Sequence, residues 1–340
     1  MIYIVAVINF AFAHFFVDVV IGDLVICCKE IIGQGAFGTV FKGQWQGRMP
    51  CAAKMLSILG NEVYTGVSLT RQNSVQEEVL AKFKWECDFM KTLRHPNIVA
   101  YYDTLFHPGS NLPVLVMELM DTSLRQYLTK MENLSIVAQF NLSCNIAAAL
   151  EFLHNKSLVH RDLCGDNILL KHTSDVHLPV AKVTDFGMSR LMIKRPEMTH
   201  SLTAIGHRPG YLPHEAGEFP TDYDESLDVF MFGAVMTQIA SKAPTIKSEA
   251  VRQQFVNQLG ANGHPLKPII SLCLDERKNR RPSSSKICAS LKAACESLSA
   301  GGMIPTTQAM DSIVNNMQQL CLDAPSAKNG MWGLFMFHDY

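Results

Sequence analysis

One short stretch constrains this chain more than any other. Residues 160–167 read H-R-D-L-C-G-D-N and are followed by the apolar run Ile-Leu-Leu. The stretch places a carboxylate, Asp162, five residues before an amide, Asn167, between two hydrophobic segments. Phosphoryl transfer onto a hydroxyl needs such a loop, because the carboxylate orients the hydroxyl and takes its proton while the amide helps to hold a metal ion. The loop therefore predicts phosphoryl transfer, provided that the rest of the chain supplies a nucleotide site.

The composition is that of a globular protein. Hydrophobic residues make up 48% of the 340 residues and charged residues 18%, which allows a sizeable buried core. Lysine and arginine together number 30 and aspartate and glutamate 31, for a formal charge of -1. Because there is no basic excess, we expect no nucleic-acid partner.

A glycine-rich stretch lies near the start of the globular part. Residues 25–32 predict a strand rich in β-branched side chains, and Gly33, Gly35 and Gly38 follow with the spacing G-x-G-x-x-G. Such glycines let the backbone approach phosphate oxygens closely. A dinucleotide-binding turn has the same spacing but opens a helix, whereas residues 39–45 continue as a strand. We therefore expect a hairpin that covers a nucleotide.

A strand and a helix are expected to follow the hairpin. Residues 51–56 read as a strand that carries Lys54, and residues 60–73 as a polar loop. The sequence S-V-Q-E at Ser74 has the form of a capping box, which predicts a helix from there to about Thr92. Apolar residues at helical spacing mark its buried face: Val79, Phe83, Cys87 and Met90.

Glu86 is the expected partner of Lys54. It lies at the edge of the buried helical face, where a carboxylate needs a compensating charge. Glu77 and Glu78 are rival partners, but both fall in the first turn of the predicted helix, where the helix dipole accounts for acidic residues.

Two later strands are expected to border the same site. Residues 112–120 predict an apolar strand that ends in a hinge, where the backbone of residues 118–120 can bond an adenine ring. Residues 180–184 predict a strand that ends at Asp185, the first residue of D-F-G. A carboxylate at that strand end would face the loop at 160–167 and supply the oxygen ligand that Mg²⁺ prefers.

In this order, the motifs resemble those of the eukaryotic protein kinases over roughly residues 24–296, and most of all the tyrosine-kinase-like branch. The resemblance implies an α+β, bilobal fold with a β-rich N-lobe that carries one main helix, and a helical C-lobe. It implies ATP and Mg²⁺ as cofactors. The partners would be protein substrates with serine or threonine acceptors, or tyrosine as the alternative.

The resemblance also implies roles for individual residues. Asp162 would be the catalytic base, and Lys54, held by Glu86, would contact the α- and β-phosphates. Asn167 and Asp185 would be the metal ligands. The ATP-binding residues would be Gly33, Gly35, Gly38, Val40, Ala52, Lys54, Met117, Glu118, Met120 and Leu169.

Further residues are implied to support the site. Asp228 resembles the buried aspartate that braces the catalytic loop, and Arg281 the arginine that pairs with the end of the activation segment, here Glu215. That end reads P-H-E where the family has A-P-E. Three hydroxyl residues of the activation segment are predicted phosphorylation sites whose phosphate would pair with Arg161. They are Thr199, Ser201 and Thr203.

The loop at 160–167 departs from the family in its charge. Serine/threonine kinases usually have lysine two residues after the aspartate, and tyrosine kinases arginine two or four residues after it; these positions are Cys164 and Asp166 here. The threonine that serine/threonine kinases place near the aspartate is also replaced, with Arg208 near that position. The overall pattern favours serine/threonine or dual specificity over tyrosine specificity. A nucleotide-binding pseudokinase scaffold is a further alternative, which the presence of Lys54, Asp162 and Asp185 disfavours.

The regions outside the predicted domain carry fewer signals. Residues 1–23 are mostly apolar, so residues 2–21 are a possible membrane anchor or a truncated start. Residues 297–340 are expected to form a C-terminal tail. The ten cysteines show no C-x-x-C pair or zinc spacing, which favours reduced thiols. We therefore expect a cytoplasmic protein, or a cytoplasm-facing one if residues 2–21 are an anchor. No pattern sets an oligomeric state.

Overall fold

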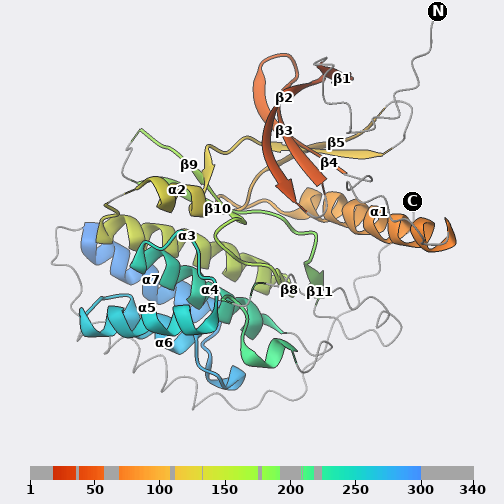
Figure 1. Cartoon of the computed structure of the whole chain (residues 1–340). Coiled ribbons are helices and arrows are strands. Elements are labelled where there is room, and N and C mark those ends of the chain that lie inside the picture. The colour runs from red at the N-terminus through yellow and green to blue at the C-terminus, as the bar shows by residue number, and fades with distance from the viewer. Residues whose placement is uncertain are drawn as a thin grey trace, which may run out of the picture.

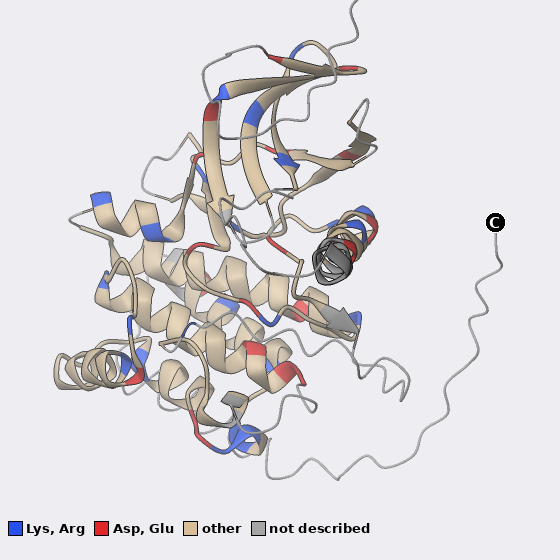
Figure 2. Ribbon diagram, turned by 45° about the vertical axis from the view of Figure 1, so that its right-hand side comes forward, with Lys and Arg blue, Asp and Glu red and all other residues tan. Residues whose placement is uncertain are grey.

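A β-rich lobe and a helical lobe are joined through residues 119–121 in the computed structural model of the chain (Figure 1). The structure describes residues 18–35, 38–56, 69–107, 112–131, 133–174, 178–191, 208, 210–217 and 224–299. This arrangement confirms the expected α+β, bilobal fold. Charges of both signs are spread over both lobes rather than gathered on one face (Figure 2).

The N-lobe is built on one antiparallel sheet with the strand order β1-β2-β3-β4-β6-β5. Its strands are β1 (Val19–Ile21), β2 (Leu24–Gly35), β3 (Gly38–Trp45), β4 (Met49–Met55), β5 (Tyr101–Phe106) and β6 (Pro113–Glu118). Side chains alternate between the two faces of a strand. In β4, Cys51 and Ala53 therefore pack in the cluster that belongs to the N-lobe alone, while Ala52 packs in the cluster shared with the C-lobe. The same alternation directs Lys54 to the face that meets the C-lobe.

The helix of the N-lobe, α1 (Leu69–Thr92), begins five residues before the predicted start. The prediction of a capping box at Ser74 is therefore wrong, since this residue lies inside the helix. Residues 69–73 read L-T-R-Q-N and contain no glycine or proline to stop the helix, so this part of the predicted loop is helical. The predicted buried face is confirmed at Phe83, Cys87 and Met90, while Val79 is only partly buried.

The C-lobe packs around one almost fully buried helix, α4 (Glu225–Ser241), whose residues 227–240 are all buried. Around it lie α2 (Leu124–Lys130), α3 (Ile136–Asn155), α5 (Glu249–Ala261), α6 (Lys267–Cys273) and α7 (Ser284–Ser299). Within the described residues, α3 is the one helix long and apolar enough to cross a membrane. More than half of that apolar stretch is buried in this lobe, as befits a core helix.

Two small sheets hold the loop at 160–167 on the C-lobe. One has the order β10-β9-β7 and the other pairs β11 with β8. Their strands are β7 (Thr122–Ser123), β8 (Leu158–Val159), β9 (Ile168–Lys171), β10 (Val180–Val183) and β11 (Arg190–Leu191). Since β8 ends just before the loop and β9 begins just after it, both ends of the loop are fixed by strand pairing.

The described elements extend slightly beyond the predicted domain limits of 24 and 296. At one end β1 pairs antiparallel with β2, so the last residues of the stretch predicted as a possible anchor belong to the sheet. At the other end α7 continues to Ser299. Residues 1–17 and 300–340 lie outside the described residues.

Candidate active site

The glycine-rich stretch forms a hairpin, as predicted. Strands β2 and β3 pair antiparallel, with Gly33 opposite Val40 and Gly35 opposite Gly38. Gly38 has φ of +157°, and a Cβ atom there would lie 2.2 Å from the carbonyl oxygen of Met55. Only glycine fits such a close approach, so this residue lets the hairpin pack against the end of β4.

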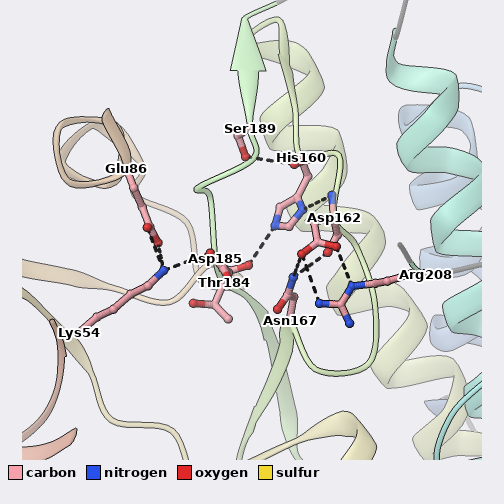
Figure 3. A network of polar contacts seen from close by, with 9 residues as sticks. All are labelled: Lys54, Glu86, His160, Asp162, Asn167, Thr184, Asp185, Ser189 and Arg208. Atoms are coloured by element: carbon pink, nitrogen blue, oxygen red, sulfur yellow. Dashed lines mark hydrogen bonds and ion pairs between the residues drawn. The ribbon is translucent and has the colours of Figure 1, made fainter. Parts of the chain in front are cut away.

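The predicted ion pair between Lys54 and Glu86 is present (Figure 3). Lys54 Nζ donates to Glu86 Oε1 at 2.7 Å and to Oε2 at 2.8 Å, and also to Asp185 Oδ1 at 3.1 Å. Lys54 is only 7% exposed, whereas the rival carboxylate Glu77 is exposed. Side chains from β4, α1 and the segment after β10 therefore meet at one point between the lobes.

Burial and charge act in opposite directions on this cluster. Burial by itself would lower the pKa of Lys54, but the carboxylates of Asp185 and Glu86 outweigh it and raise the pKa well above its ordinary value. Burial would raise the pKa of Asp185, yet the Lys54 ammonium holds it below its usual range. The pKa of Glu86 is raised by burial, which Lys54 opposes. Because two carboxylates share one ammonium, the cluster favours a further cation nearby.

Asn167 bonds Asp162 within the catalytic loop (Figure 3). Its Nδ2 donates to the carbonyl oxygen of Asp162 at 2.7 Å and to the carboxylate Oδ2 at 2.9 Å. Both amide hydrogens are therefore used on Asp162, and the amide oxygen is turned to the other side, where it can serve as a ligand.

Asp185 and Asn167 together fit a magnesium ion. The side chain of Asp185 is 34% exposed, so its carboxylate remains accessible. Among the described residues there is no group of three or more histidine, cysteine, aspartate or glutamate side chains arranged for a metal. Mg²⁺ does not need one, because it usually binds through one or two carboxylates together with waters and substrate phosphates.

The carboxylate of Asp228 bonds the backbone of the catalytic loop, as expected. Its Oδ2 accepts from the amide N–H of His160 at 2.7 Å and its Oδ1 from that of Arg161 at 2.8 Å. His154 Nε2 lies 2.9 Å from Oδ2. Burial would raise the pKa of Asp228, but His154 and these N–H donors hold it below its usual range. The loop is thus tied to the most buried helix of the C-lobe.

Backbone strain accompanies this bracing. Arg161 and Asp185 have φ values of +70° and +65°, in the left-handed region that side chains other than glycine rarely adopt. Such strain persists only where surrounding contacts fix the backbone, and it concentrates at functional sites. Here the contacts are those of Asp228 to the loop and of Lys54 to Asp185.

Several supporting residues were not predicted from the sequence. His160 Nε2 lies 3.0 Å from the carbonyl oxygen of Thr184, and its ring meets Phe186 edge-on. Phe186 also packs against Phe89 of α1, with ring centroids 5.8 Å apart. Phe89 lies three residues after Glu86, so helical spacing could have placed it on the buried face. These rings connect α1 to the catalytic loop.

The residues predicted to contact adenine lie along the lobe junction. Ala52 and Met117 are opposite each other in the pairing of β4 with β6, and both are buried. Val40 and Leu169 are partly buried and pack against the same apolar cluster. Apolar side chains from both lobes thus converge where a flat ring can be held.

The hinge residues differ in what they can offer. The carboxylate of Glu118 accepts from Lys182 Nζ at 2.9 and 2.8 Å, so its side chain is engaged by β10. The N–H of Glu118 donates to the carbonyl oxygen of Ala100. Within the described residues no hydrogen bond involves the N–H of Met120. The amide of Met120 is therefore able to donate to a ligand.

Some predicted features lie outside the described residues. These are the three hydroxyl residues Thr199, Ser201 and Thr203, and the side chain of Glu215. The ion pair of Arg281 with Glu215 stays a prediction. Arg281 donates to the carbonyl oxygens of Asp275 at 2.8 Å and Ser226 at 3.2 Å.

One basic side chain reaches the catalytic loop from far along the chain. Arg208 Nε donates to Asp162 Oδ1 at 2.8 Å (Figure 3).

A cavity of about 530 Å³ lies elsewhere, between the start of α3 and the ends of α4 and α5, and none of its lining residues belongs to this polar site.

The fold and the order of these groups agree with the comparisons to known proteins. The chain belongs to the protein tyrosine and serine/threonine kinase family, whose sequence model matches residues 26–291. The expected protein kinase domain is therefore confirmed.

Several relatives of this chain carry serine/threonine kinase names. It is 27% identical to the serine/threonine-protein kinase VIK of Arabidopsis thaliana, over 79% of this chain and 60% of the relative. It is 30% identical to the probable serine/threonine-protein kinase kinX of Dictyostelium discoideum, over 81% of this chain and 24% of the relative. For PkaA of Streptomyces coelicolor the identity is 28%, over 79% and 50%. The chain thus spans less than two thirds of the length of each.

Proposed function

We propose that this chain is an ATP-dependent protein kinase that transfers the γ-phosphoryl group of ATP to serine or threonine hydroxyls of proteins. One observation carries the proposal. Lys54 of the Lys54–Glu86 ion pair bonds Asp185 at 3.1 Å, and Asp185 lies between that ion pair and the Asp162–Asn167 pair in Figure 3. A phosphate-binding cation, a metal-binding carboxylate and a base are thereby assembled from segments far apart in the sequence.

The nucleotide would lie between the lobes. The hairpin with Gly33, Gly35 and Gly38 would cover the phosphates, and Lys54 would bind their α- and β-oxygens. The adenine ring would lie among Val40, Ala52, Met117 and Leu169. Hinge backbone groups at Glu118 and Met120 would bond its edge.

Asn167 and Asp185 would hold Mg²⁺ through their side-chain oxygens. When bound, the ion would neutralise charge on the β- and γ-phosphate oxygens. Glu86 would keep Lys54 extended beside it, because the bidentate ion pair fixes the ammonium.

Asp162 would orient the substrate hydroxyl and accept its proton. The hydroxyl oxygen then bonds to the γ-phosphorus as the bond from that phosphorus to the β–γ bridging oxygen breaks. The products are a phosphorylated protein and ADP, with the proton on Asp162. The bonds of Asp228 to the loop backbone hold Asp162 in position for this step.

A serine or threonine acceptor is supported by the names of the relatives. A cytoplasmic or cytoplasm-facing location is supported by the nine described cysteines, all of which are free thiols. We place the kinase domain at about residues 24–296. The proposal includes membrane attachment through residues 2–21 as an alternative to a free cytoplasmic protein.

Radiolabelled ATP with Mg²⁺ and a peptide array, followed by phosphoamino-acid analysis, tests the activity and the acceptor. Asp162→Asn should lower kcat by about 10²- to 10⁴-fold and leave ATP affinity nearly unchanged. Asp88→Asn is the control, because that carboxylate is exposed on α1 and pairs only loosely with Lys91. Normal phosphorylation by Asp162→Asn would rule out the proposed base. ATP binding without any phosphate transfer by the wild type would indicate a scaffold instead.

A further inference from the structure

The catalytic loop carries negative charge without a cation of its own. Asp162 and Asp166 are both carboxylates, and Cys164 lies between them. Cys164 is buried, and burial raises the pKa of its thiol to about 12, so it is neutral at physiological pH. No residue of the segment 162–167 therefore offsets the two negative charges.

Arg208 lies between these two carboxylates. Its Nε and Nη2 donate to the two Asp162 oxygens at 2.8 and 3.4 Å, and its Nη1 lies 3.5 Å from Asp166 Oδ2. A guanidinium has five N–H donors, and these contacts leave at least two of them available. The side chain is 33% exposed, so it is held by the loop and still open on one side.

The backbone that carries Arg208 is fixed on the C-lobe. Two residues later, a Cβ atom on Gly210 would lie 2.1 Å from the carbonyl oxygen of Ile246. The carbonyl of Gly210 accepts from Arg252 Nη1 at 3.0 Å, and Tyr211 donates to Gln238 at 2.8 Å. Because these partners are buried, the backbone next to Arg208 is held in place, and so is the side chain that reaches Asp162.

We propose that Arg208 supplies the cation that this catalytic loop lacks. It holds the Asp162 carboxylate in place and offsets the charge of Asp162 and Asp166 while phosphoryl transfer takes place. The proposal rests on the proposed kinase function. Arg208 makes and breaks no covalent bond: the hydroxyl proton passes to Asp162, and the γ-phosphoryl group moves from ATP to the hydroxyl oxygen, leaving ADP. Arg208 is thus a positioning residue that acts through Asp162.

Removal of the charge is the first test. Arg208→Gln should lower kcat about 10²-fold, as does the loss of one preorganised donor in other enzymes, while KM for ATP changes less than about threefold. Arg208→Lys keeps the charge and should recover at least about tenfold of the loss. Arg125→Gln is the matched control, because Arg125 also lies 3.5 Å from Asp166 but forms no ion pair with Asp162 among the described residues. We expect its kcat to stay within about twofold of wild type.

Relocation of the charge is the second test. Arg208→Thr combined with Cys164→Lys moves the cation into the loop, and its kcat should exceed that of Arg208→Thr alone by about tenfold. The thermal shift on ATP addition shows whether each variant is folded and binds nucleotide. If the double variant does not fold, the comparison of Arg208→Gln with Arg208→Lys tests the proposal.

Two results would overturn the proposal. Wild-type or higher kcat in Arg208→Gln would mean that Arg208 blocks the base rather than assists it. Equal losses of kcat and of ATP binding in the Gln and Lys variants would mean a structural role. Failure of the proposed kinase function gives a different result. The wild type itself would then bind ATP and release no ADP with any peptide, and the role assigned to Arg208 would fail with that function.

Discussion

Lys54 and Asp228 are both buried charged groups beside the same loop, but they hold different parts of the molecule together. Lys54 bonds two carboxylates, Glu86 from α1 and Asp185 from the C-lobe. Asp228 bonds backbone N–H groups and His154, all within the C-lobe. Asp185 keeps 34% of its side chain exposed, whereas Asp228 has none exposed.

This difference indicates that the two clusters have different roles. Contacts across the lobe junction can separate while each lobe stays folded, so the Lys54 cluster can form and open around a nucleotide. The Asp228 cluster cannot open without exposing the core of the C-lobe. We therefore expect changes at Lys54 to affect activity more than stability, and changes at Asp228 to affect both.

The largest effect on stability is expected for Asp228→Asn. The amide has one acceptor oxygen in place of two, and its NH₂ group faces N–H donors. We expect the free energy of unfolding in urea to fall by about 3 kcal/mol, as when a buried polar network loses its charged partner. Thr237→Val, which removes a local hydrogen bond on the same helix, should cost only about 1 kcal/mol. Equal losses would contradict the special role of Asp228.

The largest effect on activity without a matching loss of stability is expected for Lys54→Met. It removes the cation proposed to bind phosphate, so kcat/KM for ATP should fall about 10²- to 10³-fold. Glu86 can then take up a proton, because burial already raises its pKa, and the unfolding free energy should fall less than in Asp228→Asn. Lys42→Met is the control, since Lys42 pairs with exposed Glu30 on the same sheet. A greater loss of stability than in Asp228→Asn would break the comparison.

A smaller effect is expected for Glu86→Gln. Lys54 keeps its bond to Asp185 but loses the bidentate carboxylate, so kcat/KM should fall by about tenfold, equivalent to about 1.4 kcal/mol. Steady-state kinetics on Glu77→Gln give the control, because Glu77 is exposed on the same helix. If both variants lose activity equally, the pair with Lys54 is not what matters.

The Lys54 side of the site could be predicted from the sequence because its groups lie on regular elements. The hairpin followed from the strand that continues after Gly38, and Glu86 followed from its place on the helix. The start of α1 could not be predicted, because the sequence of residues 69–73 suits a helix and a polar loop equally well.

The C-lobe contacts were harder to predict from the sequence, because they join residues that no local pattern connects. The sequence indicated that the loop lacks a cation and that Arg208 replaces a threonine. It did not place the guanidinium on Asp162, 46 residues away, because that contact depends on the path of the intervening chain. The same holds for Arg252 and Arg281, whose guanidinium groups lie 4.7 Å from the ring of Phe230.

A third pair in the C-lobe sharpens the comparison because it is uncharged. His264 Nε2 lies 2.9 Å from Gln139 Oε1, and its Nδ1 accepts from the N–H of Leu266 at 3.2 Å. Burial, with nearby Lys242, lowers the pKa of His264. The unfolded chain therefore binds a proton more readily than the folded one below the unfolded pKa of about 6.5. Stability from this group is present above that pH and is lost as the pH falls below it.

His264→Gln removes this titration and can keep the bond to Gln139. The difference in Tm between wild type and variant should shrink by about 2 °C between pH 7.5 and pH 5.5, as measured by thermal unfolding. The other histidines are common to both proteins, so the difference isolates His264. A constant difference over this range would mean that folding does not change the pKa of His264, and it would contradict this prediction.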